Sequence, residues 1–102
     1  MVESQINRLI DASTECARAH GFEVSDASLP CHLMLIVTEV AEAMEEWRKS
    51  PPDYANLTSE FADVVLRVFS IAGFLDLDLE QAIYAKHEKN LQRPFRHGGK
   101  RA

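Results

Sequence analysis

The chain has 102 residues, of which 46% are hydrophobic and 26% charged, and its net charge at pH 7 is −5. That length allows one domain with a modest core, and the composition excludes a disordered chain. The longest purely apolar run covers residues 33–37, far fewer than the ~20 residues that cross a bilayer. We therefore expect one folded domain that does not enter a membrane.

The N-terminal segment and the cysteines indicate a cytoplasmic protein. The opening MVESQINRL is polar from its third residue, unlike a secretory signal. Cys16 and Cys31 provide no disulfide framework, which favours a reducing compartment. Cys16 and His20 share one helix face, but no second Cys/His pair has the spacing of metal ligands, so we do not expect a zinc site.

Charge is distributed unevenly along the chain. Residues 1–85 contain 15 Asp/Glu and 5 Lys/Arg, a balance of −10, whereas residues 86–102 contain 6 Lys/Arg and one Glu, a balance of +5. A nucleic-acid-binding protein would carry its basic residues as a broad stripe, so this pattern argues against nucleic acid as a partner. It suits a site in which acids hold a metal ion and bases hold an anion.

The first two segments with helical spacing lie before residue 50. The first covers residues 2–20, and Gly21 follows as a C-terminal cap. The second starts after Ser28, the expected N-cap, has Pro30 in its first turn and continues to about residue 49.

Two further helices follow the break SPPDYAN. The third is expected over residues 57–75, and the fourth begins with the cap-like DLEQ at 78–81 and ends before Pro94. No segment has the pattern of a strand. The expected fold is therefore all-α, a four-helix, bundle-like subunit formed by residues 1–93, with a basic, glycine-containing tail at 94–102.

The second helix has two opposed faces. Its expected core stripe consists of Leu33, Val37, Val40, Met44 and Trp47. Glu39, Glu42 and Glu46 share roughly the opposite side, and Glu45 lies off that line. Residues 31–37 are apolar nearly all round, which a single small bundle does not easily bury. A second subunit is therefore expected to pack there, giving a homodimer or homotetramer.

The third helix is apolar except for one narrow polar line. This line consists of Glu60, Asp63, Arg67 and Ser70, at i, i+3, i+7 and i+10. It faces either a strip of solvent or a polar cavity, and Arg67 is expected to pair with Asp63 one turn before it. If the line meets the Glu39/Glu42 pair of the second helix, four carboxylates converge. A cation must then neutralise them, and oxygen ligands without His or Cys favour Mg²⁺, Mn²⁺ or Ca²⁺ over zinc.

Other interpretations of these residues stay open. The acidic surface could belong to a non-catalytic helical interaction module that binds a basic partner. A carboxylate-bridged redox centre would need E-x-x-H pairs, which the sequence lacks. Trp47 and Phe61 could stack on a nucleobase, although aromatic side chains of small bundles more often belong to a core or an interface.

The paired acidic motifs resemble those of a known family. E-x-x-E at Glu39–Glu42 is followed, after 17 residues, by E-x-x-D at Glu60–Asp63, and the chain ends in KHEKNLQRPFRHGGK. Over about residues 30–100 the chain thus resembles the MazG-like superfamily of all-α nucleoside triphosphate pyrophosphohydrolases. The resemblance implies a Mg²⁺-dependent enzyme that hydrolyses a nucleoside triphosphate between the α and β phosphates, releasing the monophosphate and pyrophosphate. It leaves open the preferred base, the sugar and the physiological role.

The resemblance also implies roles for individual residues. Glu39, Glu42, Glu60 and Asp63 correspond to the Mg²⁺ ligands, with Mn²⁺ as a possible substitute.

Glu46 or, as the weaker candidate, Glu45 would act on the attacking water. Lys86 and Arg93 would contact phosphate, and Asn90 phosphate or sugar. Lys100, after Gly98 and Gly99, would close over the triphosphate.

Overall fold

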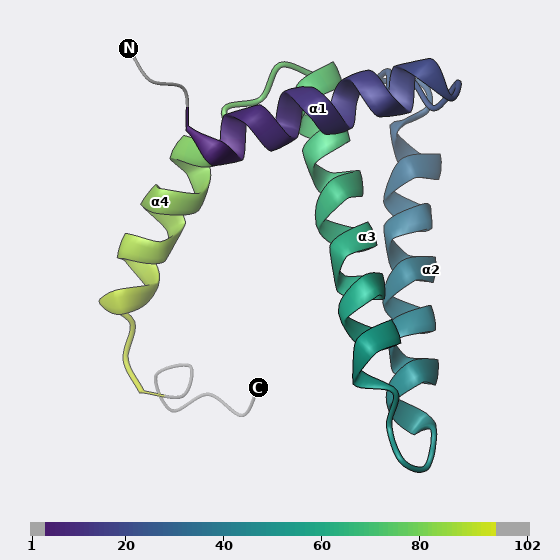
Figure 1. Cartoon of the computed structure of the whole chain (residues 1–102). Coiled ribbons are helices and arrows are strands. Elements are labelled where there is room, and N and C mark those ends of the chain that lie inside the picture. The colour runs from purple at the N-terminus through teal and green to yellow at the C-terminus, as the bar shows by residue number, and fades with distance from the viewer. Residues whose placement is uncertain (1–3, 96–102) are drawn as a thin grey trace.

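The structure is a computed structural model that describes residues 4–95, and over that range it is all-helical, with no strand. The four helices are α1 (Gln5–Ala19), α2 (Leu29–Arg48), α3 (Tyr54–Phe74) and α4 (Leu79–Leu91) (Figure 1). The predicted fold class and the number of helices are therefore confirmed. None of these helices is long and apolar enough to cross a membrane.

Polar side chains cap three of the four helices at their N-termini. The side chains of Ser4, Asp53 and Asp78 accept hydrogen bonds from backbone N–H groups three residues later, at 3.0, 3.0 and 3.2 Å. Asp53, which directly follows the two prolines, is the N-cap residue of α3. The helix therefore begins at Tyr54, three residues before the predicted start.

The sequence predicts caps at Gly21 and Ser28, and the structure confirms only the first. Gly21 adopts a positive φ of 79°, and the next N–H, of Phe22, donates to the Ala17 carbonyl at 2.8 Å, closing the end of α1 as predicted. Ser28 occupies the N-cap position of α2, but its side chain makes no capping hydrogen bond. Its hydroxyl instead accepts from the N–H of Ser25 at 2.9 Å, so the expected capping role is wrong.

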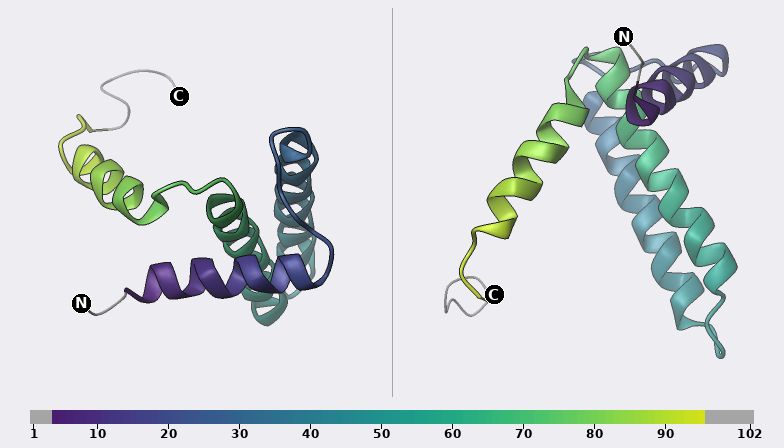
Figure 2. Two further views of the ribbon diagram at one scale, coloured as in Figure 1. Left: turned by 90° about the horizontal axis from the view of Figure 1, so that it is seen from above. Right: turned by 60° about the vertical axis from the view of Figure 1, so that its left-hand side comes forward.

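The α2 and α3 helices run antiparallel, side by side, and α1 crosses α3 near its C-terminal end (Figures 1 and 2). The Ser13 hydroxyl donates to the Leu66 carbonyl at 2.8 Å and lies 3.2 Å from the Ser70 hydroxyl. At the closest approach, Thr14 packs against Gly73, where no side chain intervenes. The α4 helix diverges from this group and does not pack along α2 or α3.

The hydrophobic core within one chain is small. Among the described residues, the buried hydrophobic side chains are Ile10, Val24, Ala43 and Ala72, and no large side chain is fully buried. The stripe that the sequence predicted as the core face of α2, from Leu33 to Trp47, is about half exposed throughout. Within a single chain that prediction is wrong, because α2 turns its Glu39 and Ala43 face toward α3 instead.

Gly73 provides a direct test of the α1–α3 crossing. A Cβ at this position would overlap the Thr14 hydroxyl and lie 2.9 Å from the Thr14 Cβ. Overpacking of this kind costs about 1–3 kcal/mol, more than the ~1 kcal/mol that alanine gains over glycine inside a helix. Gly73→Ala should therefore lower the melting temperature measured by circular dichroism at fixed protein concentration. Thr14→Ala combined with Gly73→Ala should recover part of the loss, and a Gly73→Ala protein as stable as the wild type would contradict this packing.

Candidate metal centre

Three carboxyl groups meet where α2 and α3 face each other. Glu39 and Glu42 project from α2 and Glu60 from α3, and one oxygen of each lies within 4.8 Å of the other two. Glu39 is buried, Glu60 is half-buried and Glu42 is exposed. The contact between the helices therefore brings together the E-x-x-E pair and the first residue of the E-x-x-D pair.

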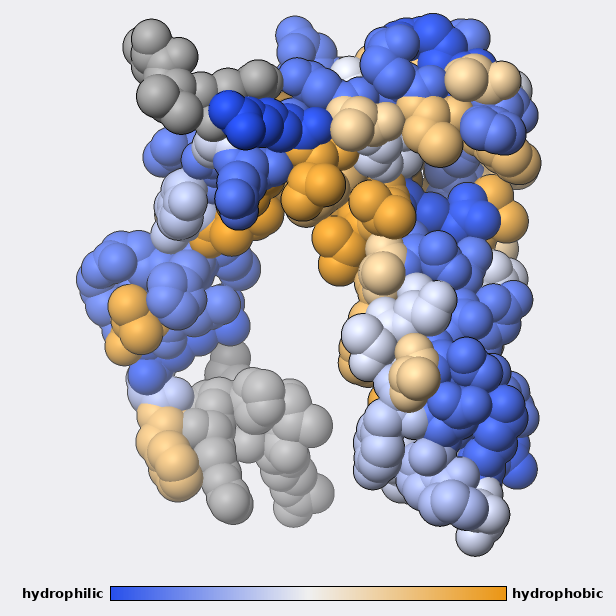
Figure 3. Space-filling view, viewed as in Figure 1, coloured by the Kyte–Doolittle hydropathy of each residue, from blue (hydrophilic) through white to orange (hydrophobic). Residues whose placement is uncertain are grey.

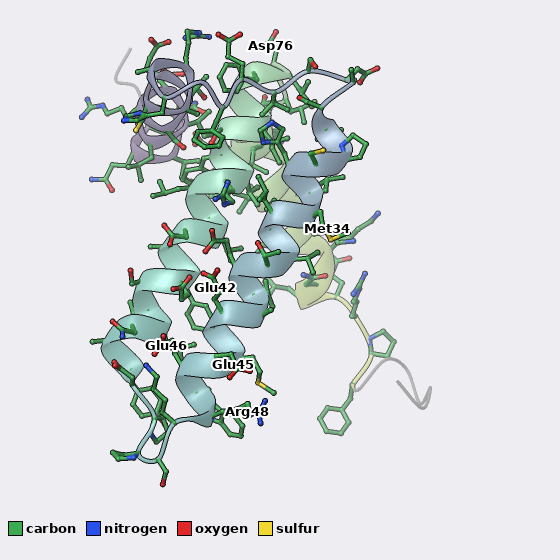
Figure 4. The ribbon with its side chains drawn as sticks, turned by 90° about the vertical axis from the view of Figure 1, so that its right-hand side faces the viewer. Met34, Glu42, Glu45, Glu46, Arg48 and Asp76 are labelled. Carbon is green, nitrogen blue, oxygen red and sulfur yellow. The ribbon has the colours of Figure 1, made fainter. Side chains whose placement is uncertain are left out.

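Helix geometry explains why Glu39 and Glu42 both face α3. Residues three and four apart lie on one face of a helix, so Glu39 and Glu42 point to the same side as the buried Ala43. The small Ala43 side chain lets α3 approach α2 closely at this level. Figure 4 shows Glu42 on the side of α2 that faces α3.

The electrostatics of this cluster are unfavourable for three free carboxylates. The pKa of Glu60 is raised to about 7, chiefly because its protonated carboxyl group can share a hydrogen bond with Glu39. Burial and the nearby Glu42 raise this pKa further. The Oε2 atom of Glu60 is buried and has no hydrogen-bond partner. A buried oxygen without a donor, among further oxygens, suits a hard divalent cation.

Arg67 forms the ion pair nearest to this cluster. Its Nε and Nη2 atoms each lie 3.1 Å from Glu39 Oε1, and both side chains are largely shielded from solvent. The sequence predicted that Arg67 would pair with Asp63, and this is wrong. The partner is Glu39, 28 positions away, which helix spacing within α3 could not reveal.

Asp63 lies outside the three-carboxylate group and lines an adjacent cavity of about 520 Å³. Arg67 and Ser70 of the same polar line also border this cavity. Most of the remaining wall comes from α1 and the segment after it, and includes Leu9, Ala12, Cys16, His20, Phe22 and Val24. The polar line of α3 thus faces both α2 and a cavity. The contribution of α1 could not be predicted from the sequence, because that wall consists mostly of ordinary apolar residues.

The two candidate catalytic carboxylates of α2 differ in their surroundings. The Glu46 side chain is 18% exposed and pairs with Lys49, and its Oε2 lies 3.5 Å from Asn56 Nδ2. The Glu45 side chain is 67% exposed and lies 3.2 Å from Arg48 Nη1. In Figure 4, Glu46 lies toward α3 and Glu45 beside Arg48 on a different side of α2. Glu46 therefore shares a face with Glu39 and Glu42, whereas Glu45 does not.

The predicted phosphate-binding residues do not join the carboxylates within one chain. Lys86 and Asn90 are exposed on α4, and Arg93 follows its C-terminal end, also exposed. Because α4 diverges from α2 and α3, these groups are separated from the cluster (Figure 1). Lys100, with Gly98 and Gly99, lies outside the described residues.

Comparison with models of protein families, with curated proteins and with solved structures gives no match for this chain.

The raised pKa of Glu60 predicts how the stability of the metal-free protein depends on pH. Folded Glu60 keeps its proton up to about pH 7, whereas unfolded Glu60 loses it near pH 4.3. The stabilisation from this proton is thus complete below the unfolded pKa and is lost as the pH rises through 7.

Glu60→Gln keeps a neutral side chain at every pH, so its melting temperature relative to the wild type should increase between pH 5 and pH 8. Thermal unfolding in a chelating buffer measures this difference. A difference independent of pH would show that Glu60 does not share a proton with its neighbours.

Proposed function

We propose that this protein is a Mg²⁺-dependent nucleoside triphosphate pyrophosphohydrolase of the MazG-like type, which hydrolyses its substrate between the α and β phosphates. The observation that carries the proposal is the meeting of Glu39 and Glu42 with Glu60 across the α2–α3 contact. Carboxylates so placed raise the pKa of Glu60 and leave its Oε2 without a partner. A divalent cation would relieve both conditions.

The residues present fit Mg²⁺ or Mn²⁺. Glu39, Glu42 and Glu60 would hold the ion, and Asp63, one turn beyond Glu60, is the proposed fourth ligand. When bound, such an ion offsets the charge of the phosphate groups and increases the acidity of water. Arg67 is the neighbouring cation on Glu39. It would orient this carboxylate and, at the edge of the cavity, face an incoming phosphate.

Glu46 is the proposed general base. It lies one turn after Glu42 on the same face of α2, and its contacts with Lys49 and Asn56 fix its side chain. Water attacks phosphorus at the α–β anhydride, the bond to the bridging oxygen breaks, and Glu46 accepts the proton from water. Proton acceptance by a positioned carboxylate typically contributes about 10²–10⁴-fold to a rate.

The cavity beside the carboxylates can accept the nucleoside part of the substrate. Its volume, about 520 Å³, falls within the roughly 300–1,000 Å³ of ligand pockets. Its wall is mainly apolar, with Leu9, Phe22 and Leu66, and Asp63 and Arg67 border it on α3. A flat, largely apolar base could therefore occupy the cavity while the phosphates extend toward the carboxylates.

A nucleotide panel tests the proposed function. The wild-type protein with Mg²⁺ should convert at least one ribo- or deoxyribonucleoside triphosphate to the monophosphate and pyrophosphate, detected by chromatography. Glu42→Gln and Asp63→Asn should each lower kcat/KM by on the order of 100-fold or more, because each removes a carboxylate proposed to hold the metal ion that offsets the charge of the phosphate groups. Glu15→Gln is the matched control, since Glu15 is exposed and pairs with Arg18 on α1.

Two outcomes of this panel would contradict the proposal. One is the absence of turnover with every nucleotide, and the other is activity that neither substitution changes. If the acidic residues instead affected only the binding of a basic protein, the non-catalytic interaction module would be the better account.

The two catalytic candidates can be separated by a pair of isosteric substitutions. Glu46→Gln should reduce kcat by at least about 100-fold, as expected for loss of a general base. Glu45→Gln should leave kcat within about threefold, because the loss of an exposed ion pair has little effect on structure. Steady-state kinetics at saturating Mg²⁺ provide the measurement. The opposite ranking would assign the base to Glu45.

A further inference from the structure

The cavity beside the carboxylates extends toward the end of the α2–α3 pair that α1 crosses. Asp63 and Ser70 both border it on α3, and the seven residues between them correspond to about 10 Å at 1.5 Å per residue. On α2, which runs antiparallel, His32 lies seven residues before Glu39, so it lies close to the level of Ser70. A ligand held at the carboxylates would therefore extend its other end toward His32 and Ser70.

Hydrophobic surface gathers at this end of the molecule. In the space-filling view it lies below α1, where that helix crosses α3, whereas the lower part of the α2–α3 pair is mainly hydrophilic (Figure 3). The cavity wall from α1 and the segment after it includes Leu9, Phe22 and the buried Val24. Such a wall accepts a flat, apolar group, so the few polar side chains among these residues decide which group binds.

The two histidines of the cavity wall each present a hydrogen-bond acceptor. His20 Nδ1 lies 2.8 Å from the Cys16 carbonyl oxygen, and His32 Nε2 lies 3.2 Å from the Glu23 carbonyl oxygen. Because a carbonyl oxygen only accepts, we assign the proton of each neutral ring to the bonded nitrogen. The acceptors are then Nε2 of His20 and Nδ1 of His32, and neither has a partner in the part of the chain that the structure describes.

The two serines of the wall present acceptors as well. The Ser13 and Ser70 hydroxyls each lie 2.8 Å from the Leu66 carbonyl oxygen and 3.2 Å from each other. Each hydroxyl has one hydrogen, which it donates either to Leu66 or to the neighbouring serine. Both hydrogens therefore stay within the protein, and a ligand in the cavity meets the lone pairs of the two oxygens.

Donors are scarce among the side chains of this wall. The thiol of Cys16 is a weak donor. Arg67 directs its Nε and Nη2 at Glu39 and borders the cavity on the side of the carboxylates, where the proposed function assigns it to phosphate. The side chains farther from the carboxylates thus present two imidazole nitrogens and two hydroxyl oxygens, all of them acceptors.

We infer that this cavity selects a nucleobase with an exocyclic amino group (cytosine, adenine or guanine) over uracil, thymine and hypoxanthine, and that His20 and His32 accept hydrogen bonds from the amino edge. An amino group supplies two N–H donors, whereas uracil and thymine have a carbonyl oxygen where cytosine has its amino group. That oxygen would face other acceptors. The identity of the ligand as a nucleotide rests on the proposed function, whereas the arrangement of acceptors does not.

Matched pairs of triphosphates test this selection. CTP has an amino group where UTP has a carbonyl oxygen, and GTP has an amino group that ITP lacks. With Mg²⁺, kcat/KM should be higher for the amino-bearing member of each pair by on the order of tenfold, the factor that one or two ordinary hydrogen bonds supply. Equal values, or a preference for UTP or ITP, would overturn the inference and leave the proposed function standing.

Phenylalanine substitutions identify the side chains responsible. His20→Phe and His32→Phe keep a flat ring and remove the acceptor, so each should reduce the preference for CTP over UTP by about threefold or more. His87→Phe is the matched control, because His87 is exposed on α4 and does not line the cavity, and it should leave the preference unchanged. Circular dichroism identifies a variant that has unfolded. Folded His20→Phe and His32→Phe proteins with the wild-type preference would contradict the role of the two histidines.

Binding of nucleoside monophosphates gives a readout without catalysis and needs no variant. Nitrogen-15 NMR of the histidine rings at pH 8 should show the proton on Nδ1 of His20 and on Nε2 of His32. Titration with CMP should shift the two acceptor nitrogens, and calorimetry should show tighter binding of CMP than of UMP and of GMP than of IMP.

The opposite tautomers, equal affinities within both pairs, or binding of neither CMP nor GMP would overturn the inference. Tighter binding of the amino-bearing monophosphates, without turnover of any triphosphate, would support the selection of the base and contradict the proposed function. The two failures can therefore be told apart.

Discussion

Three carboxyl groups meet at the contact between α2 and α3, and the electrostatic cost of that contact constrains the rest of the structure. Glu39, Glu42 and Glu60 repel one another unless a proton, a cation or Arg67 intervenes. The pKa of Glu60 is raised to about 7, chiefly because its protonated carboxyl group can share a hydrogen bond with Glu39, and burial and the charge of Glu42 raise it further. Acidic side chains therefore lie between α2 and α3, while larger hydrophobic side chains of the same helices stay exposed. A polar contact occupies the place where a hydrophobic core would ordinarily lie.

The consequence for the fold is that α2 and α3 pack through polar and small residues. Glu39 and Ala43 take the buried positions on α2, and the larger hydrophobic side chains are directed elsewhere. Such a pair gains little hydrophobic stabilisation within one chain.

Helix positions could be predicted from the sequence because they depend on local signals. The capping residue Asp78, and Gly21 after α1, lie within a few residues of the groups they bond. Two positions show the limit of such signals. The Ser28 hydroxyl accepts a hydrogen bond from the N–H of Ser25 and does not cap α2. Asp53 caps α3 directly after the two prolines, so this helix begins earlier than predicted.

The candidate site was predictable as far as helix periodicity reaches. Glu39 with Glu42, and Glu60 with Asp63, were each placed on one face by spacing alone, and three of the four meet in the structure. Helix spacing does not determine which faces of α2 and α3 contact each other, because that contact depends on the tertiary packing of segments about 20 residues apart. For that reason the sequence assigned Arg67 to Asp63 and placed Val37, Val40 and Met44 in the core.

The most direct test of the central claim is the location of a bound divalent cation. Crystals grown with Mn²⁺ should show an anomalous scattering peak between α2 and α3, in contact with Glu39, Glu42 and Glu60, and the Glu42→Gln protein should lose it. Crystals saturated with Mn²⁺ that show no peak at these three carboxylates would contradict the account.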